Sequence, residues 1–180
     1  SKVGGDHAWS ELAKLDAGGW HSRTFAGEPL PTLENVSRFC LGNGYMFNVE
    51  IKPTPGVELE TGRVVARHLA RLWADAPVPP LLTSFRPESL QGALETAAHL
   101  PRGLLLDTLP AGWLEKAVTL ECSAIVCNYA LWDDATVRRV KGAGMRCLSY
   151  TVNDPWVAQR LIALGTDGII TDRVDLFPPA

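Results

Sequence analysis

The sequence lacks a basic stripe and a long apolar run, and each absence argues against a class of protein. No signal peptide is visible, which excludes nothing, because we expect the amino-terminal part of the protein to be missing from this chain. Its 17 Lys and Arg residues are outnumbered by 20 Asp and Glu residues, and a net charge of −3 argues against a nucleic-acid partner. The apolar runs are far shorter than the ~20 residues of a membrane-spanning helix. We therefore expect neither a nucleic-acid partner nor a membrane span.

Cysteine is also scarce, with 4 residues in the chain. Cys122 and Cys127 are close in sequence, but no second pair follows at the spacing of a zinc site. Most of the cysteines lie in or beside apolar, strand-like runs, which predicts buried free thiols. Free thiols are typical of a reducing compartment, so we expect a cytoplasmic protein.

What the sequence does contain is a repeated unit, in which a short apolar strand is followed by a turn and a helix-like segment. The predicted strands are Phe47–Lys52, Leu81–Phe85, Gly103–Leu106, Ala124–Cys127, Arg146–Val152 and Gly168–Thr171. Apolar residues at helical spacing predict helices between them, at Thr61–Trp73, Glu88–Ala98, Trp113–Leu120, Thr136–Lys141 and Pro155–Leu164. This alternation predicts a parallel sheet joined by right-handed crossovers.

The number of units leaves two α/β architectures open. A TIM (β/α)8 barrel has eight strand–helix units, of which this chain would supply about six. Six units also suffice for an open, doubly wound sheet. The Gly-rich turn of a dinucleotide-binding sheet is absent, because Gly142-Ala143-Gly144 follows a helix and not a strand. The barrel is therefore favoured.

With 46% apolar residues, the 180-residue chain can bury one core, so we expect a single domain over residues 1–180. Residues 1–34 read as a connector with a short helix at Trp9–Leu15, and residues 35–180 as the strand–helix units. Thr32 and Asp154 stand at N-cap positions, before helices at Leu33–Leu41 and Pro155–Leu164. Gly165 stands at the C-cap of the latter helix.

Glu50 and Lys52 are the most informative residues, because they place opposite charges at the end of the first predicted strand. Alternation sends both side chains to the same face, and we expect them to be buried there. Charges are rarely buried unless they are paired or bind a metal, so the pair reads as a site with a carboxylate for a cation and an ammonium for an anion. The alternative is a solvated strand end with a weak ion pair.

In their order, the segments of the chain resemble the glycerophosphodiester phosphodiesterase family, especially its bacterial cytosolic members. The resemblance covers nearly all of the chain, and each matching segment is weak evidence alone. The segments are Trp9–Leu12, Leu15–Gly18, Phe25–Leu33, Asn48–Lys52, Thr83–Phe85, Arg102–Leu105, Tyr150–Asn153 and Gly165–Asp172.

The resemblance implies an eight-stranded barrel that hydrolyses glycerophosphodiesters to glycerol 3-phosphate and an alcohol, in glycerol and lipid metabolism. The family uses a divalent cation, here expected to be Mg²⁺ or Ca²⁺, with Glu50 as one ligand. Lys52 is expected to act with Glu50 in catalysis and to bind a phosphate oxygen. Phe85 and Tyr150 are expected to line the glycerol part of the substrate, and Asn153 to hydrogen-bond a hydroxyl. The alternatives are that the two aromatic rings are part of the core and that Asn153 stabilises the start of the following helix.

The sequence departs from the family pattern in its acid, base and metal groups. It contains no His-Arg-Gly, no upstream Glu-x-Asp and no His-Asp, and none of its 4 histidines ends a predicted strand. We expect the amino-terminal part of the pattern to be missing from this chain, the missing residues to complete the site, and residues 1–180 alone to be inactive.

Two other functions stay open. One is a non-catalytic, phosphate-binding or regulatory barrel domain. The other is a different barrel enzyme, such as a sugar-phosphate isomerase, which would carry a Gly-rich phosphate loop after its last strands; this chain has none. The sequence leaves the oligomeric state and the alcohol of the substrate open.

Overall fold

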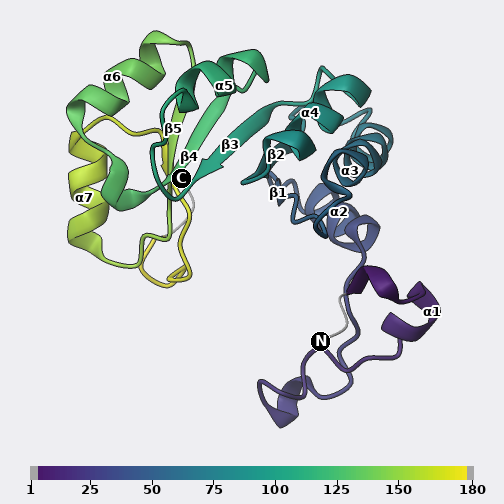
Figure 1. The fold of residues 1–180 in the computed structure, drawn as a ribbon. Coiled ribbons are helices and arrows are strands. Elements are labelled where there is room, and N and C mark those ends of the chain that lie inside the picture. The colour runs from purple at the N-terminus through teal and green to yellow at the C-terminus, as the bar shows by residue number, and fades with distance from the viewer. Residues whose placement is uncertain (1–3, 178–180) are drawn as a thin grey trace.

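The computed structural model describes residues 4–177 and contains one parallel sheet of six strands (Figure 1). The strands are β1 (Asn48–Glu50), β2 (Leu81–Ser84), β3 (Arg102–Leu106), β4 (Ala124–Asn128), β5 (Arg146–Tyr150) and β6 (Gly168–Ile169). They lie side by side in chain order, each parallel to the next. Right-handed crossovers between successive neighbours put every connecting helix on one side of the sheet. This is the order of a barrel, because a doubly wound sheet reverses its strand order.

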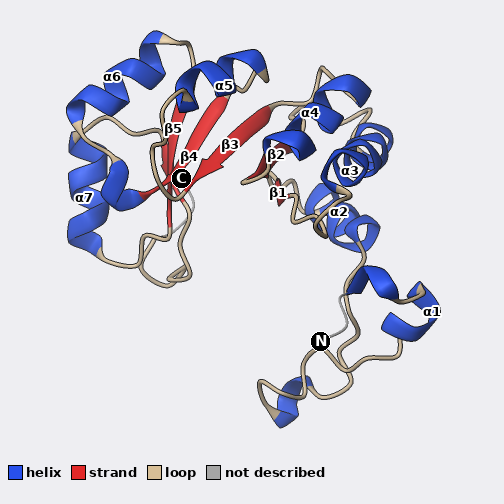
Figure 2. Ribbon diagram, in the orientation of Figure 1, coloured by secondary structure: helices blue, strands red, loops and turns tan. Residues whose placement is uncertain are grey.

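Helices occupy the predicted positions between the strands, as the blue and red elements of Figure 2 show. They are α1 (Trp9–Leu12), α2 (Leu33–Gly42), α3 (Glu58–Leu72), α4 (Pro87–Thr96), α5 (Trp113–Thr119), α6 (Asp134–Gly142) and α7 (Pro155–Ala163). Three short 3-10 turns complete the described elements, at Gly4–Asp6, Arg23–Phe25 and Tyr129–Leu131. The predicted strands and helices are confirmed, with ends displaced by about a turn or less.

The predicted N-caps are confirmed in atomic detail. Thr32 Oγ1 accepts a hydrogen bond from the backbone N–H of Asn35, at 3.0 Å. Asp154 Oδ1 accepts one from the N–H of Trp156, at 2.7 Å. Gly165 has a φ of +79°, in the left-handed region that ends helices. The C-cap of α7 is Leu164, so Gly165 lies one residue beyond the C-cap that it was predicted to occupy, and its positive φ ends the helix.

Strand register divides the sheet into two faces. Leu104, Ile125 and Cys147 are lateral neighbours, so their side chains share one face, and all three are buried against α5, α6 and α7. This is the outer, helix-covered face. A second apolar cluster lies between β1, β2 and helices α2–α4, which Figure 1 shows grouped on the other side of the molecule. Together the two clusters form the core.

Two close contacts hold the outer layer together. Arg102 begins β3 and is 3% exposed, and its guanidinium donates hydrogen bonds of 2.6–3.1 Å to four backbone carbonyls. The carbonyls lie after α4 and at the end of α5, at Ala98, Leu100, Leu120 and Glu121. Between α3 and α4, Gly62 and Gly92 face the backbone of the opposite helix so closely that a Cβ would lie 1.9 and 2.1 Å from a carbonyl oxygen.

The remaining features agree with the composition. All 4 cysteines are free, and Cys122, Cys127 and Cys147 are buried, as predicted. No helix in the described part of the chain has the length and apolar character to cross a membrane. Residues 4–31 lie apart from the sheet (Figure 1), and their one bridge joins Asp16 to Pro29.

Candidate active site at the carboxyl ends of the strands

Glu50 and Lys52 lie together at the end of β1, as predicted, with Lys52 Nζ 3.5 Å from Glu50 Oε1. Register pairs Glu50 with Thr83 and Thr83 with Gly103, which places Glu50 on the inner face, opposite the helices. The expected burial is wrong, because the side chains are 34% and 79% exposed. β1 is an edge strand of the sheet, so solvent reaches the pair. An exposed pair of this kind contributes little to stability.

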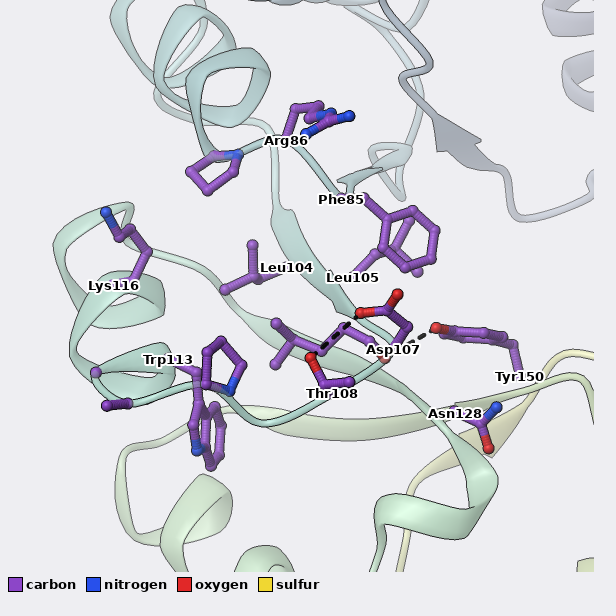
Figure 3. Close-up of a pocket in the computed structure, with 15 residues that line it drawn as sticks. Phe85, Arg86, Leu104, Leu105, Asp107, Thr108, Trp113, Lys116, Asn128 and Tyr150 are labelled. Atoms are coloured by element: carbon purple, nitrogen blue, oxygen red, sulfur yellow. Dashed lines mark hydrogen bonds between the residues drawn. The ribbon is translucent and has the colours of Figure 1, made fainter.

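Phe85 directly follows β2 and Tyr150 ends β5, yet their rings meet edge to face with centroids 5.8 Å apart. The contact spans the ends of β3 and β4 on the inner side of the curved sheet (Figure 3). The Tyr150 hydroxyl donates a hydrogen bond to the carbonyl of Leu106, at 2.8 Å, which fixes the ring. This pairing of distant strands could not be read from spacing alone.

The environment of the Tyr150 phenol links it to the charged pair. Burial raises the pKa of Tyr150 to about 12, and the negative charges of Asp107 and, less strongly, Glu50 contribute in the same direction. Both carboxylates are therefore close enough for their charges to act on this phenol. Register places Glu50 and Tyr150 on the same inner face, at the carboxyl ends of β1 and β5.

A cavity of about 690 Å³ opens beside Phe85, Asp107 and Tyr150 (Figure 3). Phe85, Asp107, Asn128 and Tyr150 line one part of it, and Leu104, Pro87, Trp113 and Lys116 line the part that reaches toward α4 and α5. A space of this size suits a small organic ligand. A smaller cavity of about 460 Å³ lies at the amino ends of the strands, near Met46 and Arg146. Barrel enzymes use the carboxyl ends, which favours the larger cavity.

Asp107 is the site residue that sequence reasoning missed. It directly follows β3, and its exposed carboxylate points toward the Phe85 and Tyr150 rings (Figure 3). The signal was present, because Asp107 is the first polar residue after the apolar run of β3 and active-site residues of barrels stand at such strand ends.

Asn153 lies beside the next strand end and is fully engaged. Its Nδ2 donates to Asp172 Oδ2 at 3.1 Å, and its Oδ1 accepts from the N–H of Asp172 at 3.0 Å and from Thr171 Oγ1 at 3.1 Å. The amide therefore ties the loop after β5 to the loop after β6. Its expected contact with a substrate hydroxyl stays a prediction.

The described residues do not supply a complete metal site. No group of three or more His, Cys, Asp or Glu side chains within residues 4–177 is arranged to hold a metal ion. Glu50 offers one accessible carboxylate, and a hard cation needs several oxygen ligands.

The histidines lie elsewhere in the structure. His7 contacts Glu11 at 3.3 Å, and His21 packs edge to face against Trp20 and Phe25 in the amino-terminal segment. His68 lies on α3 and His99 after α4, both exposed. None of the four follows a described strand, as the sequence indicated.

Residues 2–176 match the profile of the Glycerophosphoryl diester phosphodiesterase family. The chain belongs to this family. It is 30% identical to a glycerophosphodiester phosphodiesterase from Caldanaerobacter subterraneus subsp. tengcongensis over 172 residues, which are 93% of this chain and 68% of the relative. The chain spans between 64% and 70% of the length of the curated relatives it matches.

Solved structures of the family have the same architecture. A phosphodiesterase from Oleispira antarctica, in complex with the product sn-glycerol-3-phosphate, superimposes with a TM-score of 0.82 at 28% identity, over 92% of this chain and 66% of that one. A glycerophosphodiester phosphodiesterase from Agrobacterium tumefaciens gives a TM-score of 0.74 at 26% identity, over 93% and 69% of the two chains. The barrel reading is confirmed, and the doubly wound sheet is excluded.

Proposed function

We propose that this protein acts in the hydrolysis of glycerophosphodiesters to glycerol 3-phosphate and an alcohol. The observation that carries the proposal is the Glu50–Lys52 pair at the carboxyl end of β1, on the same inner face as the Phe85–Tyr150 ring pair that lines a cavity. An ammonium for the phosphate and aromatic walls for the organic part are what a small phosphodiester requires. The family membership and the sn-glycerol-3-phosphate bound by the Oleispira relative support it.

Lys52 is the group that we assign to the phosphate. Its side chain is 79% exposed, and among residues 4–177 its ammonium forms an ion pair with Glu50 alone, at 3.5 Å, so it can turn toward a phosphate oxygen. A phosphodiester resists attack because its anionic oxygens repel nucleophiles, and a nearby cation lowers that barrier as charge develops. Phe85 and Tyr150 would line the organic part of the substrate. Asn153 would reach a hydroxyl only by releasing one of its present hydrogen bonds.

Glu50 is the residue that we propose as a ligand of a divalent cation, Mg²⁺ or Ca²⁺. Such an ion would neutralise the phosphodiester and polarise its phosphorus. No group of three or more potential ligands within residues 4–177 is arranged to hold a metal ion, so a working site needs further ligands and a proton donor. The four free cysteines support our expectation of a reducing, cytoplasmic location.

A non-catalytic, phosphate-binding domain is the second candidate. It is favoured by the position of the histidines, since none of the four lies at the carboxyl ends of the described strands. This candidate predicts the same binding of glycerol 3-phosphate but no turnover in any metal.

Binding and turnover should be measured separately on the purified 180-residue chain. Titration calorimetry with sn-glycerol 3-phosphate tests the phosphate site, and release of glycerol 3-phosphate from glycerophosphocholine, with Mg²⁺, Ca²⁺ or a chelator, tests catalysis. We expect binding without turnover. Absence of binding would refute the proposed site, and metal-dependent turnover would refute the expectation that these residues alone are inactive.

The variant Lys52→Met should weaken binding of glycerol 3-phosphate about tenfold, because a charge-assisted hydrogen bond to the phosphate is lost. Glu50→Gln should change this binding little without metal and remove any strengthening by Mg²⁺ or Ca²⁺. Lys14→Met is the matched control, because Lys14 is exposed in the amino-terminal segment, away from the sheet. An equal loss in Lys14→Met would mean that only the overall charge matters.

A further inference from the structure

Asp107 has a carboxylate that lines the cavity, and the proposed hydrolysis assigns it no role. It is exposed, and within residues 4–177 no ion pair includes it. Its one hydrogen bond from a side chain is a long contact of 3.5 Å from Thr108 Oγ1. A free carboxylate that lines a cavity is available to a cation from solution.

The surroundings of Asp107 select the kind of cation. Figure 3 shows its carboxylate directed toward the Phe85 and Tyr150 rings, which meet at an interplanar angle of 82°. Because the two rings lie at nearly a right angle, one presents its face and the other its edge to the cavity. The face of an aromatic ring attracts organic cations. The Tyr150 hydroxyl is already used by the Leu106 carbonyl, which holds its ring in place. A carboxylate beside fixed aromatic rings is typical of sites for alkylated ammonium groups.

The protein's own cations near the cavity do not neutralise Asp107. Lys52 is paired with Glu50. Arg86 is close to Glu58, whose pKa is lowered by hydrogen bonds from backbone N–H groups and, less strongly, by the Arg86 charge. Lys116 lies on α5, on the far side of Leu104 from Asp107 (Figure 3). The acidic part of the cavity therefore stays open to a positive ligand.

We infer that Asp107, with the Phe85–Tyr150 ring pair, binds a positively charged alcohol group of the substrate, so that this chain prefers glycerophosphodiesters of amino or quaternary ammonium alcohols over those of neutral alcohols. The inference rests on the proposed function and adds the class of alcohol to it. It also moves the Phe85–Tyr150 ring pair from the glycerol part of the substrate, where the sequence placed it, to the alcohol. Lys52 and Asp107 then hold the opposite charges of one zwitterionic ligand, with the phosphate near β1 and the ammonium near β3.

The test uses two ligands that differ only in charge. Glycerophosphocholine carries a trimethylammonium group, and the 3,3-dimethylbutyl ester of glycerol phosphate replaces its nitrogen by carbon with almost the same shape. Titration calorimetry on the 180-residue chain should give a dissociation constant about tenfold lower for glycerophosphocholine. Glycerol 3-phosphate, which lacks the second alcohol esterified to the phosphate, is titrated in parallel.

Two variants assign the preference to this site. Asp107→Asn keeps the shape of the side chain and removes its charge, and should reduce the tenfold preference to about threefold. Phe85→Leu keeps an apolar side chain without a ring face, and should reduce it to a similar extent with no change in charge. Asp75→Asn is the control, because Asp75 is an exposed acid in the turn after α3, and it should leave the preference unchanged.

The outcomes separate this inference from the proposed function. If glycerol 3-phosphate binds and the two diesters bind equally well, the inference is refuted and the proposed function stands. If glycerol 3-phosphate and both diesters fail to bind, the proposed function is refuted and the inference with it. An equal loss of preference in Asp75→Asn would trace the preference to the net charge and would also refute it.

Discussion

The two faces of the sheet use the same strands for different purposes. On the outer face, Leu104, Ile125 and Cys147 are buried under helices and form part of the core. On the inner face, Glu50 keeps a third of its side-chain surface exposed and Asp107 and Tyr150 face a cavity. Because side chains alternate along a strand, each strand end can hold the core with one residue and carry chemistry with the next. Substitutions on the two faces should therefore have separate effects.

Arg102 and Arg146 give the sharpest form of this comparison. Each begins a strand, β3 or β5, but register places Arg102 beside Leu82 on the outer face and Arg146 beside Ala124 on the inner face. Arg102 is 3% exposed and donates to four backbone carbonyls, whereas Arg146 is exposed. We expect Arg102→Met to lower the free energy of unfolding by about 4 kcal/mol, because buried carbonyls lose their charged donor.

Arg146→Met is the matched control and should change the free energy of unfolding by less than about 0.5 kcal/mol. Urea unfolding followed by circular dichroism measures both. Similar losses in the two variants would mean that the inner and outer faces contribute alike. Arg102→Lys should also be destabilising, since a lysine cannot reach several carbonyls with a planar group.

The contact between α3 and α4 is a second part of the outer layer that is tightly packed. A Cβ on Gly92 would lie 2.1 Å from the carbonyl oxygen of Leu59, so Gly92→Ala must push the helices apart. We expect a loss of about 2–3 kcal/mol in urea unfolding, and no change in glycerol 3-phosphate binding. Gly142→Ala, at the end of α6, is the control, because its Cβ would meet nothing within 4 Å. A stable Gly92→Ala variant would show that these helices can move.

The elements of the fold could be predicted because each depends on local signals. The strands covered by helices are continuous apolar runs. Thr32 and Asp154 cap the start of a helix by accepting hydrogen bonds from nearby backbone N–H groups, and Gly165 follows the end of α7 with a positive φ. The Glu50–Lys52 contact was also predictable, since alternation alone brings residues two positions apart to one face.

The rest of the site depends on distances across the sheet, which no sequence spacing encodes. The Phe85–Tyr150 ring contact arises from the curvature of the sheet across β3 and β4. The exposure of Glu50 and Lys52 follows from the edge position of β1, which local pattern does not show. Arg102 stands first in an apolar strand, where its burial looks unfavourable until the carbonyls of two other segments surround it.

The Tyr150→Phe substitution changes a residue of the inner face, and we expect it to have the smallest effect on the free energy of unfolding. Tyr150→Phe loses the hydrogen bond to the Leu106 carbonyl and should cost about 1 kcal/mol near neutral pH. Burial raises the pKa of Tyr150 to about 12, above the ordinary value near 10 of an unfolded chain. The folded protein therefore keeps this proton longer than the unfolded chain, and the stabilisation is complete below about pH 10 and is lost as the pH rises toward about 12.

The wild-type protein should consequently lose its advantage over Tyr150→Phe between about pH 10 and about pH 12 in urea unfolding. Tyr45→Phe, which removes an exposed phenol, is measured in parallel as the control. A gap between wild type and Tyr150→Phe that stays constant over this range would mean that Tyr150 is as free to ionise in the folded protein as in the unfolded chain. The hydrogen bond to the Leu106 carbonyl would then not hold the Tyr150 ring in place. The inner face would in that case lack the fixed aromatic ring that distinguishes it from an ordinary solvated sheet surface.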